Sequence, residues 1–209
     1  MKIYFDGDSW TKGNDLDEEH RLSIRFSALV SKALGAEEYN ISRSGSSNQR
    51  ILRNLATKNF NEKYDLAVIQ LTFPSRTEYY DGKKFKQINS HVVRRSDGSY
   101  NVAKKGIHGL SRRVRDKDNG GSSYFWEMYF NRIYDDVYGH TIEEMVHNSV
   151  KSICKVKNIP LIMLSCFRNT KLSYDIMILP EIYEPVSDTN LHPSVSSQIS
   201  IASDVYNLL

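Results

Sequence analysis

Short apolar runs alternate along this chain with stretches whose apolar residues recur every three or four positions. Four of the runs have the length and composition of buried β-strands, and they span residues 3–5, 39–41, 66–71 and 161–164. Helical spacing occurs between several of these runs, and strands that alternate with helices are typical of a parallel sheet. The pattern therefore predicts an α/β fold.

Two helices are predicted in the first third of the chain. The first has an apolar stripe that we expect to face the sheet, and Gly35 is placed to end it. The second is expected to begin after the sequence SGSSN. The stripe of the first helix consists of Leu22, Phe26, Leu29, Val30, Ala33 and Leu34, and the second helix carries Ile51, Leu52 and Leu55.

Two further helices are predicted towards the carboxyl end. One is expected to begin at a capping box formed by Thr141 and Glu144 and to run towards Lys157. The last is expected to begin beside His192, where proline starts it or Ser194 caps it. Its apolar stripe is predicted to consist of Val195, Ile199, Ala202, Val205 and Leu209.

The alternating pattern breaks at about residues 74–121. Within this stretch, HVVRRSDGSYNV predicts a β-hairpin whose turn contains Asp97 and Gly98. A connection of this length is typical of a functional lid or a flexible segment. We interpret it as an insertion after the third strand of a single domain that spans residues 1–209.

The composition is that of a soluble globular protein, with 209 residues, of which 40% are hydrophobic and 25% are charged. The start of the chain has no features of a secretory signal, and no apolar run reaches membrane-spanning length. A soluble protein that is cytoplasmic as synthesised is expected. Cys154 and Cys166 have no metal or redox spacing, and an intracellular pair of this kind is usually buried thiol, so no disulfide is expected. The histidines have no spacing with cysteine or aspartate that would form a metal site, so neither a metal nor another cofactor is predicted.

Positive charge is concentrated in the insertion. The whole chain carries +3, whereas residues 74–125 carry +7. This segment is either a solvated loop or a lid that attracts an anionic ligand, such as an acidic polysaccharide. Nucleic acid is not favoured as a partner, because no recognition motif accompanies the charge. The aromatic stretch at residues 124–130 is interpreted as core rather than as a platform for carbohydrate.

Three polar stretches follow predicted strands or precede the last helix: GDSW at residue 7, SRSGSSN at residue 42 and DTNLHPS at residue 188. GDS alone is also a common turn sequence. Together and in this order, the three stretches resemble the motifs of the SGNH (GDSL) hydrolase family. The resemblance spans nearly the whole chain but is confined to these motifs. It implies a flavodoxin-like three-layer α/β/α sandwich with a central parallel sheet of about five strands.

The resemblance also implies a catalytic triad. Ser9 matches the nucleophile, His192 the base and Asp188 the residue that orients the histidine. A serine hydroxyl becomes a good nucleophile only when an imidazole removes its proton, and a carboxylate stabilises the resulting imidazolium. The family usually has two residues between aspartate and histidine, whereas this chain has three. The alternative is that Asp188 only shapes the turn and that Thr189 or a backbone carbonyl orients His192.

An oxyanion hole is implied by the same resemblance. The N–H groups of Ser9 and Gly45 match two of its donors, but the sequence TFPSR has no asparagine at the position of the third. Loss of one donor costs about 2.7 to 4 kcal/mol of transition-state stabilisation. The candidate replacements are Asn48, Thr72, Ser75 and Arg76. The variant TFPSRTEYY is also similar to SGNH-like proteins of tailed phages.

The motifs predict a serine esterase that removes a small acyl group, such as O-acetyl from a carbohydrate, through an acyl-Ser9 intermediate. Acyl transfer to a sugar instead of water uses the same residues and stays open. The alternative from another class is a non-catalytic SGNH-like binding module that holds an anionic glycan or another partner through its basic insertion.

Overall fold

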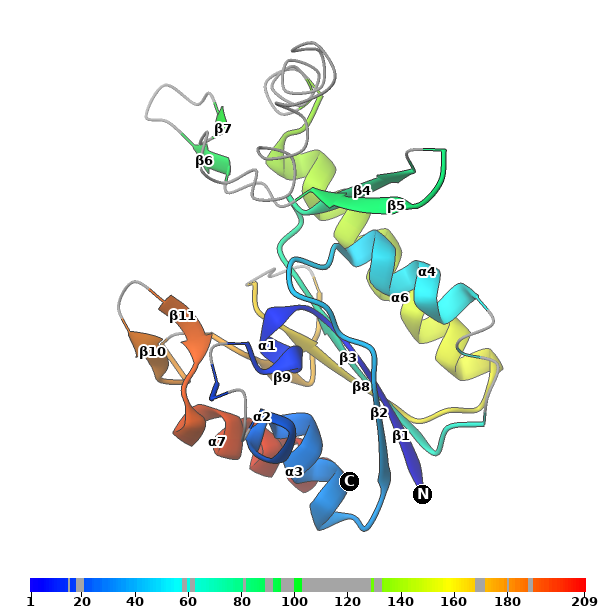
Figure 1. The fold of residues 1–209 in the computed structure, drawn as a ribbon. Coiled ribbons are helices and arrows are strands. Elements are labelled where there is room, and N and C mark those ends of the chain that lie inside the picture. Colours follow the sequence, from blue (N-terminus) through cyan, green and yellow to red (C-terminus); the bar gives the residue numbers. More distant parts are fainter. Residues whose placement is uncertain are drawn as a thin grey trace.

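A parallel sheet of five strands forms the centre of the computed structural model, in the order β2-β1-β3-β8-β9 (Figure 1). The model describes residues 1–14, 16–17, 21–57, 60, 63–80, 82–88, 92–94, 100–102, 129, 133–167, 172–179, 181–187 and 190–209. The strands are β1 (Lys2–Asp6), β2 (Glu37–Asn40), β3 (Leu66–Leu71), β8 (Leu161–Ser165) and β9 (Ile176–Met177).

The sheet confirms the predicted α/β fold. The first four strands coincide, within a few residues, with the four apolar runs, and the short strand β9 completes the sheet. Counted along the chain, the strand order is 2-1-3-4-5, which is the order of flavodoxin-like folds. Because all five strands run parallel, their carboxyl ends meet at one edge, and the motifs GDSW and SRSGSSN follow two of these ends, those of β1 and β2.

Helices cover both faces of the sheet and produce three layers (Figure 1). One face packs against α3 (Phe26–Ala33) and α7 (Val195–Asn207), with α1 (Ser9–Lys12) and α2 (Arg21–Ile24) beside them. The other face packs against α4 (Asn48–Ala56) and α6 (Asp136–Val156). Successive strand side chains point to opposite faces, so Ile3 and Phe5 join the first core and Tyr4 joins the second.

The predicted first helix is divided into α2 and α3. The backbone of Arg25 is extended, and its guanidinium pairs with Glu38 of β2 at 3.0 Å. This break turns α2 away from the core, so Leu22 is 63% exposed, and its expected place in the buried stripe is wrong. The predicted end is confirmed, because Gly35 adopts a left-handed φ of 59° that favours glycine.

The capping box predicted at Thr141 is wrong. The helix α6 begins at Asp136 with Asp135 as its N-cap, and the Asp135 side chain accepts a hydrogen bond from the Tyr138 N–H at 2.6 Å. Thr141 lies inside the helix and donates to the Val137 carbonyl at 2.8 Å. Aspartate caps helices as well as threonine does, and the earlier cap gives the longer helix.

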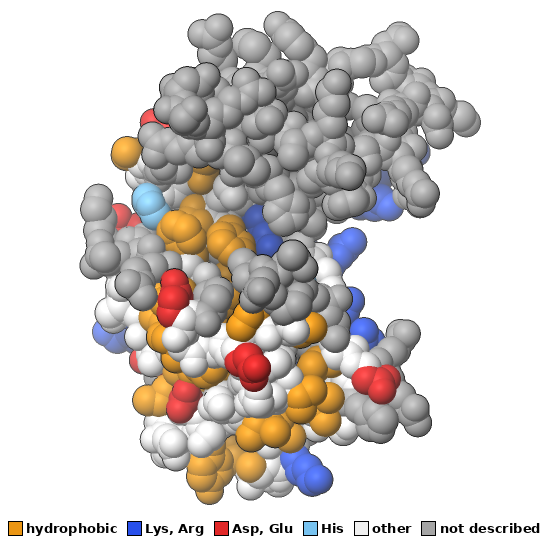
Figure 2. Space-filling model, turned by 90° about the vertical axis from the view of Figure 1, so that its left-hand side faces the viewer, with side chains coloured by type: hydrophobic (Ala, Val, Ile, Leu, Met, Phe, Trp, Pro, Cys, Tyr) orange, Lys and Arg blue, Asp and Glu red, His pale blue; other side chains and the backbone are white. Residues whose placement is uncertain are grey.

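The predicted cap of α7 is confirmed, but its predicted stripe is only partly correct. The Ser194 hydroxyl accepts a hydrogen bond from the Ser197 N–H. Ala202 and Val205 are buried as expected, whereas Val195 and Ile199 are about half exposed. Figure 2 views the side of the molecule on which α7 lies, and apolar side chains are visible on this face of the molecule. The residues of α7 that are buried are Ser197, Gln198, Ile201, Ala202 and Val205.

Among the residues that the structure describes between β3 and α6, two antiparallel strand pairs occur. β6 (Val92–Arg94) and β7 (Tyr100–Val102) pair antiparallel and confirm the predicted hairpin, although its turn at residues 97–98 lies outside the described residues. β4 (Thr77–Tyr80) and β5 (Phe85–Ile88) form an unpredicted hairpin. Much of the basic segment and most of the aromatic stretch also lie outside the described residues. Within the described ranges, no helix has both the length and the apolar character needed to cross a membrane.

Candidate active site

Ser9 lies in a tight turn at the carboxyl end of β1. The strand ends at Asp6, and Asp8 is the N-cap of α1, where its carboxylate accepts a hydrogen bond from the Trp10 N–H at 2.9 Å. The N–H of Ser9 belongs to the first turn of α1 and therefore has no acceptor within the helix. Ser9 itself is 5% exposed. The hydroxyl is thus at the edge of the sheet where open α/β folds place their sites.

Gln70 of β3 links the Ser9 turn to the neighbouring strand. Its Oε1 accepts a hydrogen bond from the Thr11 N–H at 3.1 Å and a second one from the Thr11 hydroxyl. Gly7 is required beside it, because a Cβ at this position would lie 2.9 Å from the Cβ of Gln70 and closer still to Thr11. The signal for Gln70 in the sequence was a lone amide in the apolar run LAVIQL.

The residue that precedes Ser9 forms a largely buried ion pair. Asp8 is fully buried, and its Oδ1 accepts from Gln70 Nε2 at 2.9 Å while its Oδ2 accepts from the Thr72 hydroxyl at 2.7 Å. Arg76 completes the network through an ion pair with the same carboxylate, and its guanidinium lies 5.1 Å from the ring centroid of Phe73. The sequence motif TFPSR is therefore bound, through Thr72 and Arg76, to the residue that precedes the candidate nucleophile.

The turn that bears Gly45 lies against the turn that bears Ser9. The N–H of Arg43 donates to the carbonyl of Gly7 at 3.2 Å, which brings the two motifs together. Gly45 is buried and has a φ of 70°, which explains why glycine is used at this position. Ser47 then caps α4, and its hydroxyl accepts from the Arg50 N–H at 3.2 Å.

The four candidate replacements for the missing oxyanion donor differ in their bonding. Asn48 is engaged with the backbone of Thr72, donating to its carbonyl at 3.0 Å and accepting from its N–H at 2.8 Å. The Thr72 hydroxyl has a single proton, which it donates to Asp8. Ser75 is half-buried in the turn after β3. Arg76 Nη1 donates hydrogen bonds to the Asp8 carboxylate and to the Thr72 hydroxyl oxygen. With its other guanidinium N–H groups, Arg76 has the most donors of the four.

His192 lies in β11 (Asn190–Pro193), which pairs with β10 (Pro185–Ser187) and leads into α7. The strand β11 contacts α1, so the elements that bear Ser9 and His192 lie side by side although they are far apart in the sequence (Figure 1). His192 is half-buried. Asp188 lies outside the described residues, and its orienting role stays a prediction.

Sequence reasoning did not identify the partners of Asp6, a second buried carboxylate near the site. Its oxygens accept hydrogen bonds from the Gly7 N–H at 2.8 Å and Asn54 Nδ2 at 2.8 Å, and Asp6 pairs with Arg50 at 2.9 Å. Burial raises the pKa of Asp6 to about 6, although these three donors lower it. Asp6 is fully buried, and its contacts with Asn54 and Arg50 link β1 to α4.

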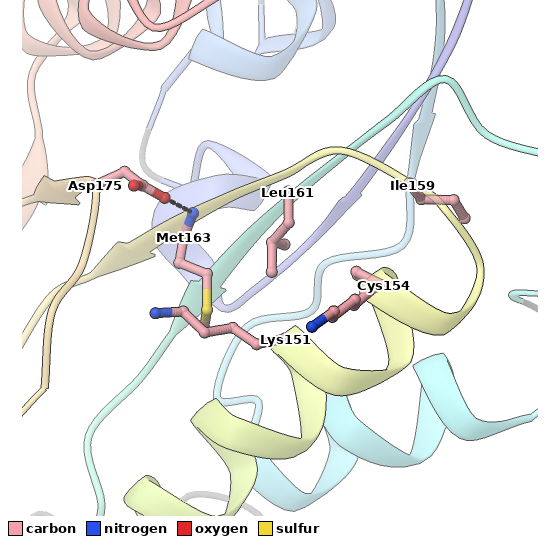
Figure 3. Close-up of a pocket in the computed structure, with 7 residues that line it drawn as sticks. Lys151, Cys154, Ile159, Leu161, Met163 and Asp175 are labelled. Carbon is pink, nitrogen blue, oxygen red and sulfur yellow. Dashed lines mark hydrogen bonds between the residues drawn. The ribbon is translucent and has the colours of Figure 1, made fainter.

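Neither cysteine is placed as a nucleophile. Both thiols are free and buried, and burial raises the pKa of Cys154 to about 11 and that of Cys166 to about 12. Cys154 lines a cavity of about 290 Å³ between α6 and β8 that contains none of the predicted site residues (Figure 3). The cavity is lined by Lys151, Cys154, Lys155, Ile159, Leu161, Met163 and Asp175. Within the part of the chain that the structure describes, no group of histidine, cysteine and acidic residues is arranged to hold a metal ion.

Comparisons with known proteins agree on the fold. No protein-family model and no curated protein matches the sequence. The solved structure of TesA is similar over 99% of this chain and 97% of its own length, with a TM-score of 0.52 and 12% identity. A carbohydrate esterase, described as having an active site with divergent catalytic and non-catalytic binding functions, is similar over 99% of this chain and 64% of its own, with a TM-score of 0.51 and 14% identity.

A protein of the G-D-S-L lipolytic family from Desulfitobacterium hafniense DCB-2 also matches, with 14% identity, a TM-score of 0.41 and coverage of 100% of this chain and 99% of its own. At 12% and 14% identity, the likeness to TesA and to the carbohydrate esterase shows the fold alone. The chain therefore has the fold of the SGNH hydrolases, as its motifs predicted.

Proposed function

We propose that this chain is a serine esterase of the SGNH type that removes a small acyl group through an acyl-Ser9 intermediate. The observation that carries the proposal is the position of Ser9. Its turn lies at the carboxyl edge of the sheet, against the Gly45 turn and in contact with the strand that bears His192. An O-acetylated carbohydrate is the proposed substrate class, and the structural likeness to a carbohydrate esterase supports it.

In the proposed reaction, the Ser9 hydroxyl attacks the ester carbonyl while His192 accepts its proton. The tetrahedral intermediate then collapses, the bond to the alcohol oxygen breaks, and His192 returns the proton to the leaving alcohol. Water attacks the acyl-Ser9 ester in the second half of the reaction, again with His192 as the base. The products are the free acid, the alcohol and the unmodified serine.

The negative charge on the carbonyl oxygen is proposed to be stabilised by the N–H groups of Ser9 and Gly45. Arg76 is the proposed substitute for the missing asparagine, because the Thr72 proton is already donated to Asp8. A guanidinium carries a permanent charge and several donors, so one N–H can bind Asp8 while another stabilises the oxyanion.

A fluorophosphonate probe tests the proposal directly. Such a probe reacts with an activated serine and should label Ser9, which peptide mass spectrometry would locate. Labelling at another residue, or none under conditions in which a known serine esterase reacts, contradicts the proposed function.

Asp188 is proposed to orient His192. The substitution Asp188→Asn keeps the size of the side chain and removes its charge, and we expect it to lower kcat by about a hundredfold or more, because the imidazolium loses its stabilising carboxylate. Turnover of p-nitrophenyl acetate measures the effect, and the melting temperature of the variant controls for unfolding. A reduction in kcat of less than about threefold would mean that Asp188 only shapes the turn and does not orient His192.

The alternative function is a binding module without catalysis. Two observations favour it: the engaged Thr72 hydroxyl, and the likeness to an esterase whose active site is described as having non-catalytic binding functions. This alternative predicts no probe labelling, together with salt-sensitive binding of an acidic glycan through the insertion. Equal retention on acidic and neutral glycan columns argues against it.

A further inference from the structure

The first hairpin of the insertion, formed by β4 and β5, contacts helix α4 through side chains. The guanidinium of Arg53 forms two hydrogen bonds, of 2.9 Å and 3.0 Å, with the carboxylate of Glu78 on β4. The same guanidinium lies 4.0 Å from the ring centroid of Phe85 on β5. The Glu78 side chain is 5% exposed, so this ion pair is shielded from water on the Glu78 side. This part of the insertion is therefore built onto the helix that follows the Gly45 turn.

Gln87 extends this contact to the Gly45 turn itself. Gln87 is the cross-strand partner of Glu78, and its Nε2 donates to Glu78 Oε2 at 2.8 Å. Its Oε1 accepts a hydrogen bond from the backbone N–H of Ser47 at 2.8 Å. A continuous series of polar contacts thus joins Arg53, Glu78, Gln87 and Ser47.

The Ser47 N–H needs a partner from outside its own helix. Ser47 is fully buried and is the N-cap of α4. In a capping box, a glutamate or glutamine three residues later accepts a hydrogen bond from the N–H of the cap. That position is occupied here by Arg50, which has no acceptor and pairs with Asp6. Gln87 supplies the missing acceptor from a distant part of the chain.

The Gly45 turn is therefore held on both sides. On one side, the Arg43 N–H donates to the Gly7 carbonyl, and on the other side the Ser47 N–H donates to Gln87. Glycine at position 45 has unusual backbone freedom, and these two contacts restrict the backbone on either side of it. We propose that Gln87 is a positioning residue for the oxyanion hole, which makes the β4–β5 hairpin part of the catalytic scaffold. This inference rests on the proposed function.

The substitution Gln87→Ala tests the inference. We expect kcat for p-nitrophenyl acetate to fall about tenfold to a hundredfold with KM within twofold, because a misdirected oxyanion donor affects the transition state more than the bound substrate. The rate of Ser9 labelling by the fluorophosphonate should fall by a similar factor. A kcat within twofold of that of the unmodified protein overturns the inference.

Two further variants separate positioning from general loosening of the hairpin. Thr77→Val removes the hydroxyl that Gln49 contacts at 3.4 Å on the same hairpin and leaves Gln87 in place, so its kcat should not change. The double variant Glu78→Gln with Gln87→Glu exchanges the two partners and keeps an acceptor for Ser47, so it should recover most of the lost kcat. A loss in Thr77→Val equal to that in Gln87→Ala would assign the effect to hairpin docking alone.

Amide hydrogen exchange distinguishes failure of this inference from failure of the proposed function. In Gln87→Ala, exchange of the Ser47 N–H should become at least about tenfold faster, whether or not the protein is an enzyme. If the unmodified chain neither turns over the ester nor reacts with the probe, the proposed function fails, and the role of Gln87 in catalysis fails with it. If the unmodified chain is active but exchange at Ser47 does not change, only the inference about Gln87 fails.

Discussion

Ser9→Ala should reduce turnover of short p-nitrophenyl esters to the background rate, a loss of about a millionfold for a typical serine hydrolase. The variant lacks the oxygen that forms the acyl intermediate, so fluorophosphonate labelling should disappear as well. The matched control is Ser31→Ala. The Ser31 hydroxyl is also buried but has no hydrogen-bond partner among the described residues, so its loss should leave turnover and folding unchanged.

The companion substitution His192→Ala is expected to have a similar effect, because the hydroxyl then has no base. The two residues act in one step, so the double variant should be no slower than either single variant. Substantial turnover in either single variant would contradict the proposed mechanism, provided that a contaminating esterase has been excluded from the preparation. Multiplying effects in the double variant would show that the two side chains act independently.

Arg76→Met should have the largest effect on stability. Removal of the guanidinium leaves the fully buried Asp8 carboxylate without its counter-ion, and breaking a buried ion pair in this way costs about 3 to 5 kcal/mol of unfolding free energy. Denaturation by urea, followed by circular dichroism, measures the change. The loss should be accompanied by lower esterase activity, since Asp8 also caps the helix that begins with Ser9.

The double variant Asp8→Asn with Arg76→Met is the control for this result. It removes both charges together, so no unpaired charge is buried, and it should regain more than half of the lost unfolding free energy. If Arg76→Met alone costs less than about 1 kcal/mol, then water or the three neutral donors around Asp8 compensate for the charge. The double variant would then be the less stable of the two.

The predicted fold agrees with the structure wherever a single local signal decides the outcome. The strand at residues 66–71 is recognisable because a run of apolar residues this short can be buried on both faces of a parallel sheet. Gly35 and Ser194 mark the ends of helices because their effect is confined to one turn of backbone. The start of α6 was missed because two adequate caps, Asp135 and Thr141, compete, and sequence alone does not rank them.

The apolar stripes of α3 and α7 were predicted less well than the helices themselves. Periodicity shows that a helix has an apolar side, but the side that is buried depends on where the neighbouring elements lie. On α7, Gln198 is buried because its Oε1 accepts the N–H of Phe26 at 2.8 Å, a contact across most of the chain. Ile199 lies on another side of the helix and is exposed.

The sequence by itself determined the class of fold, the order of the three motifs and the place of Ser9 at the end of the first strand, because each depends on local patterns and on the rule that parallel strands end at one edge. Only the tertiary structure decided that Arg76 pairs with Asp8, that Gln87 supports the Ser47 cap and that β11 contacts α1. These contacts join residues far apart in the chain. Their partners are chosen by how the layers pack, which no local pattern records.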